Sequence, residues 1–277
     1  MSNRQYPGSR SPDAALFEAL IAAAVEAGRV AHDIYRRGFT VHQKEDQSPV
    51  TDADHAAEAV ILRHLAAAAP TVPVIAEEEV AAGRIPAIGR EFLLVDPLDG
   101  TKEFVQKRGD FTVNIALIRE GVPALGVVYA PAKSSLFGGD VCSRSAFHAD
   151  QDPDSGRLAA RRQIQVRPAP AGGLTAVSSR SHSTPETDAY LSSYKILDRV
   201  SVGSSLKFCL IAAGEADLYP RLGTTMEWDT AAGHAVLLAA GGGVWAPGAV
   251  PLRYGKPAFR NTWFVASGGL TPLPLAG

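Results

Sequence analysis

The sequence has few cysteines, few aromatic residues and almost no net charge. Its 277 residues include two cysteines, 7% aromatic side chains and a formal charge of −2. Cys142 and Cys209 are too few for a disulfide framework and lie in no zinc-binding pattern, which favours a reducing compartment. The balanced charge provides no general field that would attract a nucleic-acid polymer or an anionic membrane.

Long apolar runs are also missing. No run approaches the roughly 20 residues that a membrane-spanning helix requires. The first 12 residues are polar and lack the pattern of a secretory signal. We therefore predict a cytoplasmic globular protein without a transmembrane segment, a monomer or homodimer with enough residues to bury a large core.

Hydrophobic periodicity predicts a mixed α/β fold in two halves, 1–170 and 171–277. The first half reads as α+β, with helices at 12–38 and after Thr51, followed by several β-rich runs. Its strands are expected at 72–76, 92–95, 112–119, 124–130 and around 136–137. Segment 148–162 is charged and is expected to be an exposed hairpin tip. The second half alternates as in α/β proteins, with strands at 174–178, 196–202, 216–219, near 244 and at 263–266, and helices at 184–193, 205–213 and 230–240.

The most informative stretch is 92–104, in which a predicted buried strand ends in the string Asp-Pro-Leu-Asp-Gly-Thr-Lys. Pro97 has no N–H, so the strand pairing is expected to stop there. The turn places Asp96, Asp99 and the Leu98 carbonyl on one side, and three hard oxygen ligands suit Mg²⁺. The ordinary alternative is a strand-to-turn Asp-Pro followed by a helix cap, because Asp and Pro are common turn residues.

The full string resembles the signature of the inositol-monophosphatase-like, lithium-sensitive, Mg²⁺-dependent phosphatases. The extension Lys102-Glu103-Phe104 is more similar to the 3'(2'),5'-bisphosphate nucleotidase branch than to the inositol branch. The resemblance covers the chain from the first helix to about Trp263. It implies a layered α-β-α-β-α sandwich and two or three bound Mg²⁺ ions.

Further acidic residues take roles from this resemblance. Glu77 follows a strand and matches a metal ligand, with Glu78 as a neighbouring participant in catalysis, although a run of Glu is usually a solvated face. Asp229, in Glu-Trp-Asp-Thr, matches a ligand beside the substrate and is otherwise a good N-cap. Asp54 completes a capping box with Thr51 and, by resemblance, positions the attacking water together with Thr101. The implied metal ligands are Glu77, Asp96, Leu98, Asp99 and Asp229.

Two strings in the second half are candidates for phosphate binding. A Gly-Ser-Ser turn opens a predicted helix with free N–H groups, and Lys207 adds a positive charge. Segment 178–182 carries Arg180 and His182. In isolation each string reads as an ordinary turn or helix cap. The expected substrate contacts are Gly100, Thr101, Lys102, Arg180, His182, Gly203, Ser204, Ser205, Lys207 and Asp229.

These observations predict a phosphatase that hydrolyses adenosine 3',5'-bisphosphate to AMP and phosphate, in the context of sulfur assimilation. The substrate is expected to be a small nucleotide or sugar phosphate. Two alternatives remain: an inositol-monophosphate or fructose-bisphosphate phosphatase with the same metal site, and a non-catalytic, metal-dependent nucleotide-binding protein. A serine hydrolase is excluded, because no Gly-x-Ser-x-Gly elbow is present.

Overall fold

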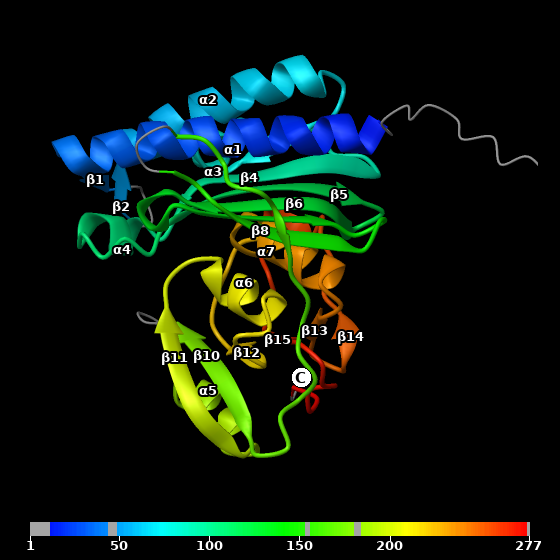
Figure 1. Cartoon of the computed structure of the whole chain (residues 1–277). Helices are drawn as coiled ribbons and strands as arrows, with labels where there is room; N and C mark the ends of the chain where they lie inside the picture. The colour runs from blue at the N-terminus through cyan, green and yellow to red at the C-terminus, as the bar shows by residue number, and fades with distance from the viewer. Residues whose placement is uncertain (1–11, 44–48, 153–155, 180–183, 276–277) are drawn as a thin grey trace, which may run out of the picture.

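The computed structural model describes residues 12–43, 49–152, 156–179 and 184–275. The elements form five layers, in the order helices, sheet, helices, sheet, helix (Figure 1). This is the predicted α-β-α-β-α sandwich. No helix in these ranges is both long and apolar enough to cross a membrane.

The first layer consists of α1 (Pro12–Arg37) and α2 (Asp52–Ala68), which pack along each other. Helix α1 buries Leu20, Ala24, Ala27 and Ala31 at helical spacing, as predicted. The small alanine side chains allow the two helices and the sheet beneath them to approach closely. Between the helices, β1 (Val41–Gln43) and β2 (Pro49–Thr51) form an antiparallel ribbon that the sequence did not indicate.

The second layer is a seven-stranded sheet with the order β3-β4-β5-β6-β7-β8-β9. Strand β3 runs parallel to β4 and all other neighbours are antiparallel. The strands are β3 (Val74–Ala76), β4 (Glu91–Asp99), β5 (Thr112–Arg119), β6 (Val122–Ala130), β7 (Ser135–Asp140), β8 (Ser145–Asp150) and β9 (Arg162–Gln163). Three short helices lie at its margins: α3 (Glu77–Ala81), α4 (Thr101–Val105) and η1 (Pro131–Lys133).

Both faces of this sheet are covered, which explains the nearly continuous apolar runs of its central strands. Along β5, Val113 and Ile115 pack toward α1 and α2, whereas Ala116 and Ile118 belong to the core on the other face. That second core contains α6 (Leu206–Ala212) and α7 (Trp228–Ala239), which form the middle layer.

The fourth layer is a six-stranded sheet with the order β11-β10-β12-β15-β13-β14. Its strands are β10 (Leu174–Ser179), β11 (Ile196–Val202), β12 (Leu218–Arg221), β13 (Gly243–Ala246), β14 (Val250–Pro251) and β15 (Phe264–Ser267). Tyr219 and Phe264 face the middle helices, while Leu218 and Val265 belong to a smaller core with α5 (Pro185–Leu191). A short helix, η2 (Pro257–Phe259), precedes β15.

Two details differ from the sequence prediction. Pairing of β4 does not stop at Pro97: Asp96 pairs with Asn114 and Asp99 pairs with Thr112, with an irregularity between them. The bulge accommodates a proline because Pro97 lies between the two pairs. Segment 148–162 is not only a hairpin tip, because His148 lies within β8 and pairs with Arg162 of β9. The division into halves near residue 170 stays a prediction, and the middle helices share one core with both sheets.

Candidate active site

A pocket of about 630 Å³ opens where the edge of the first sheet meets the middle helices. Loops after β4 and β12 and the starts of α3, α4, α6 and α7 supply its wall. It is lined by Pro49, Glu77, Asp96, Leu98, Asp99, Gly100, Thr101, Lys102, Glu103, Thr184, Gly203, Ser204, Lys207, Phe208, Tyr219, Arg221, Gly223, Thr224, Thr225, Asp229 and Thr230. The four carboxylates expected to bind metal therefore share one cavity.

The bulge at the end of β4 orients the first two carboxylates. The Leu98 N–H donates to Asp96 Oδ1 at 3.0 Å, which closes a tight local turn. The Leu98 carbonyl accepts the Thr101 hydroxyl at 3.2 Å, just as the chain enters α4. The bulge thus places two aspartates and one carbonyl oxygen on the pocket wall, as the sequence predicted.

Asp99 is held from behind by two polar side chains. The hydroxyl of Ser205 has one proton to donate and lies 3.1 Å from Asp99 Oδ2 and 2.7 Å from the Asp229 carbonyl oxygen. The Asn114 amide donates to Ser205 Oγ at 3.0 Å and to Asp99 Oδ2 at 3.3 Å. Asn114 belongs to β5 and Ser205 precedes α6, so this cluster ties the first sheet to the middle layer.

Asp229 lies in the first turn of α7, where the helix dipole favours a negative charge. Its carboxylate accepts the Met226 N–H at 2.8 Å. The sequence suggested Asp229 as an alternative N-cap of this helix. It is not the N-cap, because the helix begins at Trp228 and Glu227 occupies the cap position.

The acidic run after β3 becomes the first turn of α3 and is not an exposed face. Glu77 lines the pocket, whereas Glu78 is buried. The Glu78 N–H donates to Glu58 Oε2 at 2.8 Å, so a carboxylate of α2 accepts a hydrogen bond from the first turn of α3. Burial raises the pKa of Glu58 to about 7, and the neighbouring acidic charges act in the same direction.

The pocket concentrates negative charge in a buried place. Burial raises the pKa of Asp96, Asp99 and Asp229 above the usual value. The charge of Glu77 raises the pKa of Asp96 and Asp229 further, while Lys207 opposes the rise at Asp99. Buried carboxylates that repel one another are stabilised either when one of them is protonated or when a cation binds among them.

Thr101 lines the pocket, and Asp54 contacts it from behind the wall. Thr51 holds one oxygen of the Asp54 carboxylate through its backbone N–H at 2.8 Å and its hydroxyl at 2.7 Å. The hydroxyl of Thr101 faces the other oxygen at 3.3 Å. Burial raises the pKa of Asp54 to about 7. The capping box and the contact with Thr101 exist together, so the two interpretations of Asp54 do not compete.

Comparison with known proteins assigns this architecture. The model of the inositol monophosphatase family matches residues 13–262. The chain belongs to the inositol monophosphatase family. It is 43% identical over 247 residues to the 3'(2'),5'-bisphosphate nucleotidase CysQ of Escherichia coli (strain K12), covering 88% of this chain and 96% of that protein. The CysQ nucleotidase of Salmonella typhimurium is 43% identical over 228 residues, covering 82% of this chain and 88% of the relative.

Solved structures agree with this assignment. The crystal structure of CysQ from Bacteroides thetaiotaomicron, a bacterial member of the inositol monophosphatase family, superposes with a TM-score of 0.77 at 37% identity. The match covers 92% of this chain and 97% of that one. An inositol monophosphatase from Anabaena superposes with a TM-score of 0.72 at 27% identity, covering 92% of this chain and 91% of that chain.

The donor set of this family member fits a hard divalent cation. Every predicted ligand presents oxygen, and the ligands come from three separate segments of the pocket wall, the end of β4 and the starts of α3 and α7. Within the described ranges no three acidic, histidine or cysteine side chains are grouped closely enough to hold a metal ion by themselves. An open wall of carboxylates suits Mg²⁺, which is usually bound by a few carboxylates and completed by substrate phosphate and water.

Two cationic side chains border the acidic wall. Lys207 is buried, donates to the Ser204 carbonyl at 2.5 Å, and lies over the Tyr219 ring. Burial lowers its pKa to about 8, while the charge of Asp99 opposes the fall. Arg221, at the end of β12, donates to the Thr224 carbonyl at 3.1 Å. Its Nε is buried and has no hydrogen-bond partner in the described part of the chain.

The predicted substrate contacts fall into three groups. Gly100, Thr101, Lys102, Gly203, Ser204, Lys207 and Asp229 line the pocket. Ser205 lies behind the wall, because its hydroxyl is engaged by Asp99 and Asp229. Arg180 and His182 lie outside the described residues.

The two glycines are required by close packing against the backbone of Asp110. A Cβ at Gly100 would lie 2.9 Å from the Asp110 carbonyl oxygen, and Gly100 also has a φ of +93°. A Cβ at Gly203 would lie 2.8 Å from the same oxygen. A side chain at either position would therefore displace the pocket wall.

Sequence reasoning missed Glu58, Asn114 and Arg221. Glu58 was detectable as an acid on the apolar face of α2, one turn after Asp54. Asn114 interrupts an otherwise apolar central strand, which is a similar signal. Arg221 gave no signal, because an arginine at a strand end is usually solvent-exposed.

Proposed function

We propose that this protein is a Mg²⁺-dependent phosphatase that hydrolyses the 3'-phosphate of adenosine 3',5'-bisphosphate, giving AMP and phosphate in sulfur assimilation. The observation that carries the proposal is one pocket lined by four carboxylates together with Lys207 and Arg221. The 43% identity to CysQ nucleotidases supports the choice of substrate. A substrate with two phosphates needs an acidic, metal-binding wall for one and a cation for the other.

The metal would be held by Glu77, Asp96, the Leu98 carbonyl, Asp99 and Asp229. Two or three Mg²⁺ ions held there supply charge neutralisation for the phosphate, a lower pKa for a bound water, and stabilisation of the leaving alkoxide. Ser205 and Asn114 fix Asp99 Oδ2, while the Met226 N–H fixes Asp229 Oδ2.

Asp54 and Thr101 handle the proton in this proposal. The Thr101 hydroxyl accepts a proton from the attacking water and passes its own to Asp54 Oδ1, 3.3 Å away. Thr51 keeps the other Asp54 oxygen occupied, so one oxygen faces the hydroxyl. The water oxygen forms a bond to phosphorus as the bond to the ribose O3' breaks, the released O3' takes up a proton from solvent to give AMP, and Asp54 returns its proton to solvent. No covalent intermediate on the enzyme is required.

The phosphate that does not react would face Arg221 and Lys207. Arginine suits this task, because its guanidinium presents several donors to phosphate oxygens, and one donor of Arg221 has no partner among the described residues. A monophosphate such as inositol monophosphate would leave these cations without their counterpart.

We further propose that the protein acts in the cytoplasm as a monomer or homodimer. Two free cysteines are consistent with a reducing compartment.

A substrate panel with phosphate release as the readout tests the proposal. Adenosine 3',5'-bisphosphate, inositol monophosphate, fructose 1,6-bisphosphate and AMP are compared at fixed Mg²⁺ and again with excess chelator. We expect the highest kcat/KM for the nucleotide bisphosphate and no release under chelation. Higher kcat/KM for inositol monophosphate would refute the substrate assignment, and unchanged release under chelation would refute the metal dependence.

A further inference from the structure

The turn between β12 and α7 carries three residues of the pocket wall and leads to a fourth, Asp229 in α7, but has little regular structure of its own. Gly223, Thr224, Thr225 and Asp229 all line the pocket. The only β-bridge within the described part of this turn joins Met226 to Arg260. Something outside the turn must therefore hold Asp229 in register with the carboxylates at the end of β4.

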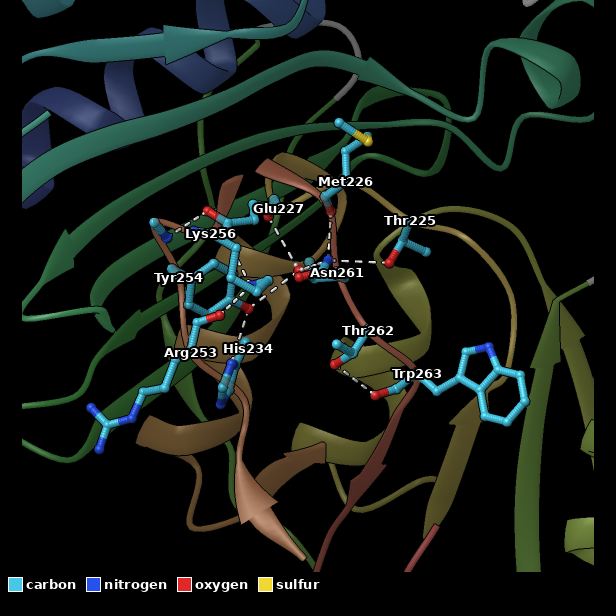
Figure 2. A network of polar contacts seen from close by, with 12 residues as sticks. Thr225, Met226, Glu227, His234, Arg253, Tyr254, Lys256, Asn261, Thr262 and Trp263 are labelled. Atoms are coloured by element: carbon cyan, nitrogen blue, oxygen red, sulfur yellow. Dashed lines mark hydrogen bonds and ion pairs between the residues drawn. The ribbon is translucent and has the colours of Figure 1, made fainter. Parts of the chain in front are cut away.

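Asn261 spans this turn from the far side (Figure 2). Its side-chain amide donates to the Met226 carbonyl at 2.7 Å and lies 3.1 Å from Thr225 Oγ1 and 3.0 Å from Thr230 Oγ1. Its backbone N–H donates to the Thr225 carbonyl at 3.0 Å. One buried asparagine that does not line the pocket thus contacts both ends of the segment that presents Asp229.

The orientation of the Asn261 amide is fixed by its neighbours. Exchanging its nitrogen and oxygen would set a carbonyl oxygen against the Met226 carbonyl. In the observed orientation Asn261 Oδ1 is buried and has no hydrogen-bond partner among the described residues. A buried acceptor without a partner lowers stability. An asparagine kept for stability alone would be a poor choice, so the amide donors point to a role in the site.

A second contact holds the same segment against the turn. Glu227 is fully buried, and its carboxylate accepts the N–H of Gly255 at 2.8 Å and that of Lys256 at 2.9 Å. The Lys256 ammonium pairs with it at 2.7 Å (Figure 2). The Glu227 N–H in turn donates to the Phe259 carbonyl at 2.8 Å. Segment 255–261 therefore packs along the turn and is joined to it at two points. Gly255 and Lys256 contact Glu227 at one point, and Asn261 contacts Thr225 and Met226 at the other.

We propose that Asn261 is a positioning residue for Asp229, acting through the backbone of Met226. Asn261 holds the carbonyl of Met226, and the N–H of the same residue holds Asp229 Oδ2 at 2.8 Å. Loss of the side-chain amide removes the hydrogen bond to the Met226 carbonyl and leaves only backbone contacts, from the Asn261 N–H to the Thr225 carbonyl and between Met226 and Arg260. The donor that orients the Asp229 carboxylate is then held less firmly. The inference rests on the proposed function, in which Asp229 is a metal ligand.

The test compares Asn261→Ala with the adjacent Thr262→Ala as a matched control. Thr262 is exposed, and its hydroxyl donates to the Trp263 carbonyl, away from the turn. Mg²⁺ binding to chelator-treated protein is measured by calorimetry with the metal alone. The unfolding temperature is recorded, and kcat and KM are determined over a Mg²⁺ titration.

We expect Asn261→Ala to weaken Mg²⁺ binding about 10- to 100-fold, the usual effect of removing a group that orients a metal ligand. Excess Mg²⁺ should restore part of its rate, and Thr262→Ala should bind Mg²⁺ like the wild type. Asn261→Asp should bind more weakly than the wild type although its volume is unchanged, because it sets an oxygen against the Met226 carbonyl. If the alanine variant does not fold, Asn261→Ser, which keeps one donor, serves in the same comparison.

Two outcomes would overturn the inference, and they can be told apart. If wild-type protein binds Mg²⁺ and the folded Asn261 variants bind it equally well, with a change only in unfolding temperature, Asn261 is a structural residue and the proposed function stands. If wild-type protein itself binds no Mg²⁺, the proposed metal site fails, and the inference fails with it.

Discussion

The hydroxyl of Thr101 offers the sharpest test of the proposed proton path. Its two contacts, to Asp54 Oδ1 at 3.3 Å and to the Leu98 carbonyl at 3.2 Å, are long for an O–H donor. Such contacts contribute little in the resting enzyme. Removing the hydroxyl should therefore change substrate binding only slightly, and its effect should fall on the transition state.

The size of the effect follows from the role. General-base assistance typically contributes about 10²- to 10⁴-fold to the rate, which corresponds to roughly 2.7–5.4 kcal/mol of transition-state stabilisation. Thr101→Val keeps the shape and removes the hydroxyl, so we expect kcat to fall by about that factor with KM changed by a few-fold at most. Thr101→Ser keeps the hydroxyl and should retain most of the rate.

The assay is steady-state phosphate release at saturating Mg²⁺, with unfolding temperature as the control for folding. Asp54→Asn should cause a loss similar to that of Thr101→Val. The double variant should lose little more than either single one, because the two residues act as a unit. A change confined to KM, or fully additive losses, would refute the relay and leave Asp54 as a helix cap alone.

Three further predictions concern other parts of the molecule. Arg221→Ala should lower kcat/KM for adenosine 3',5'-bisphosphate about 10- to 150-fold, the worth of a charge-assisted phosphate contact of roughly 1.5–3 kcal/mol; equal losses on a monophosphate would contradict this. Li⁺ titrated against fixed Mg²⁺ should inhibit more than matched Na⁺, as the family resemblance implies, and equal effects would count against it. Burial lowers the pKa of His234 to about 3, so between pH 6.5 and 3 only the unfolded state takes up this proton. The free energy of unfolding, measured with urea, should therefore fall by up to about 2 kcal/mol between pH 6.5 and pH 5 because of His234. In His234→Phe the free energy of unfolding should depend less steeply on pH over this range.

The sequence predicted those features that depend on local pattern. The apolar spacing of α1 predicted a packed first helix, and the alternation of strands and helices after residue 174 predicted the α/β layers of the second half. The strand end at Asp96 and Asp99 predicted the position of the acidic pocket wall, because a polar string directly after a buried run must lie at the edge of a sheet. Pro97 misled the prediction only in detail, since a bulge lets pairing resume at Asp99.

The roles of the remaining site residues could not be predicted, even where a residue stood out in the sequence, because these roles depend on contacts between distant segments. Asn114 and Ser205 are 91 positions apart and meet at Asp99. Asn261 acts on Asp229 through the backbone of Met226, a route that no spacing rule describes. Ser205 shows how a local pattern misses a contact: its place in a Gly-Ser-Ser turn suggested phosphate binding, which stays a prediction, while its hydroxyl contacts Asp99 and Asp229.

The charge of the pocket makes a last prediction, about stability. Asp96, Asp99 and Asp229 are buried among like charges, so the folded state without a cation carries a repulsion that the unfolded chain lacks. Mg²⁺ at 100 times its dissociation constant should add about 2.7 kcal/mol to the free energy of unfolding, or roughly 5–10 °C in unfolding temperature for a chain of this size.

Asp99→Asn separates this effect from a general action of salt. It removes one negative charge and little volume, so the variant should unfold at a higher temperature than the wild type in chelator. It should also gain less from Mg²⁺ and release no phosphate. The measurement is a thermal melt in chelator, in Mg²⁺ and in Na⁺ of equal ionic strength. If Mg²⁺ and Na⁺ stabilise the wild type equally, or if Asp99→Asn gains as much from Mg²⁺ as the wild type, these carboxylates do not hold the metal. Repulsion among the acids would then have to be relieved by protonation instead.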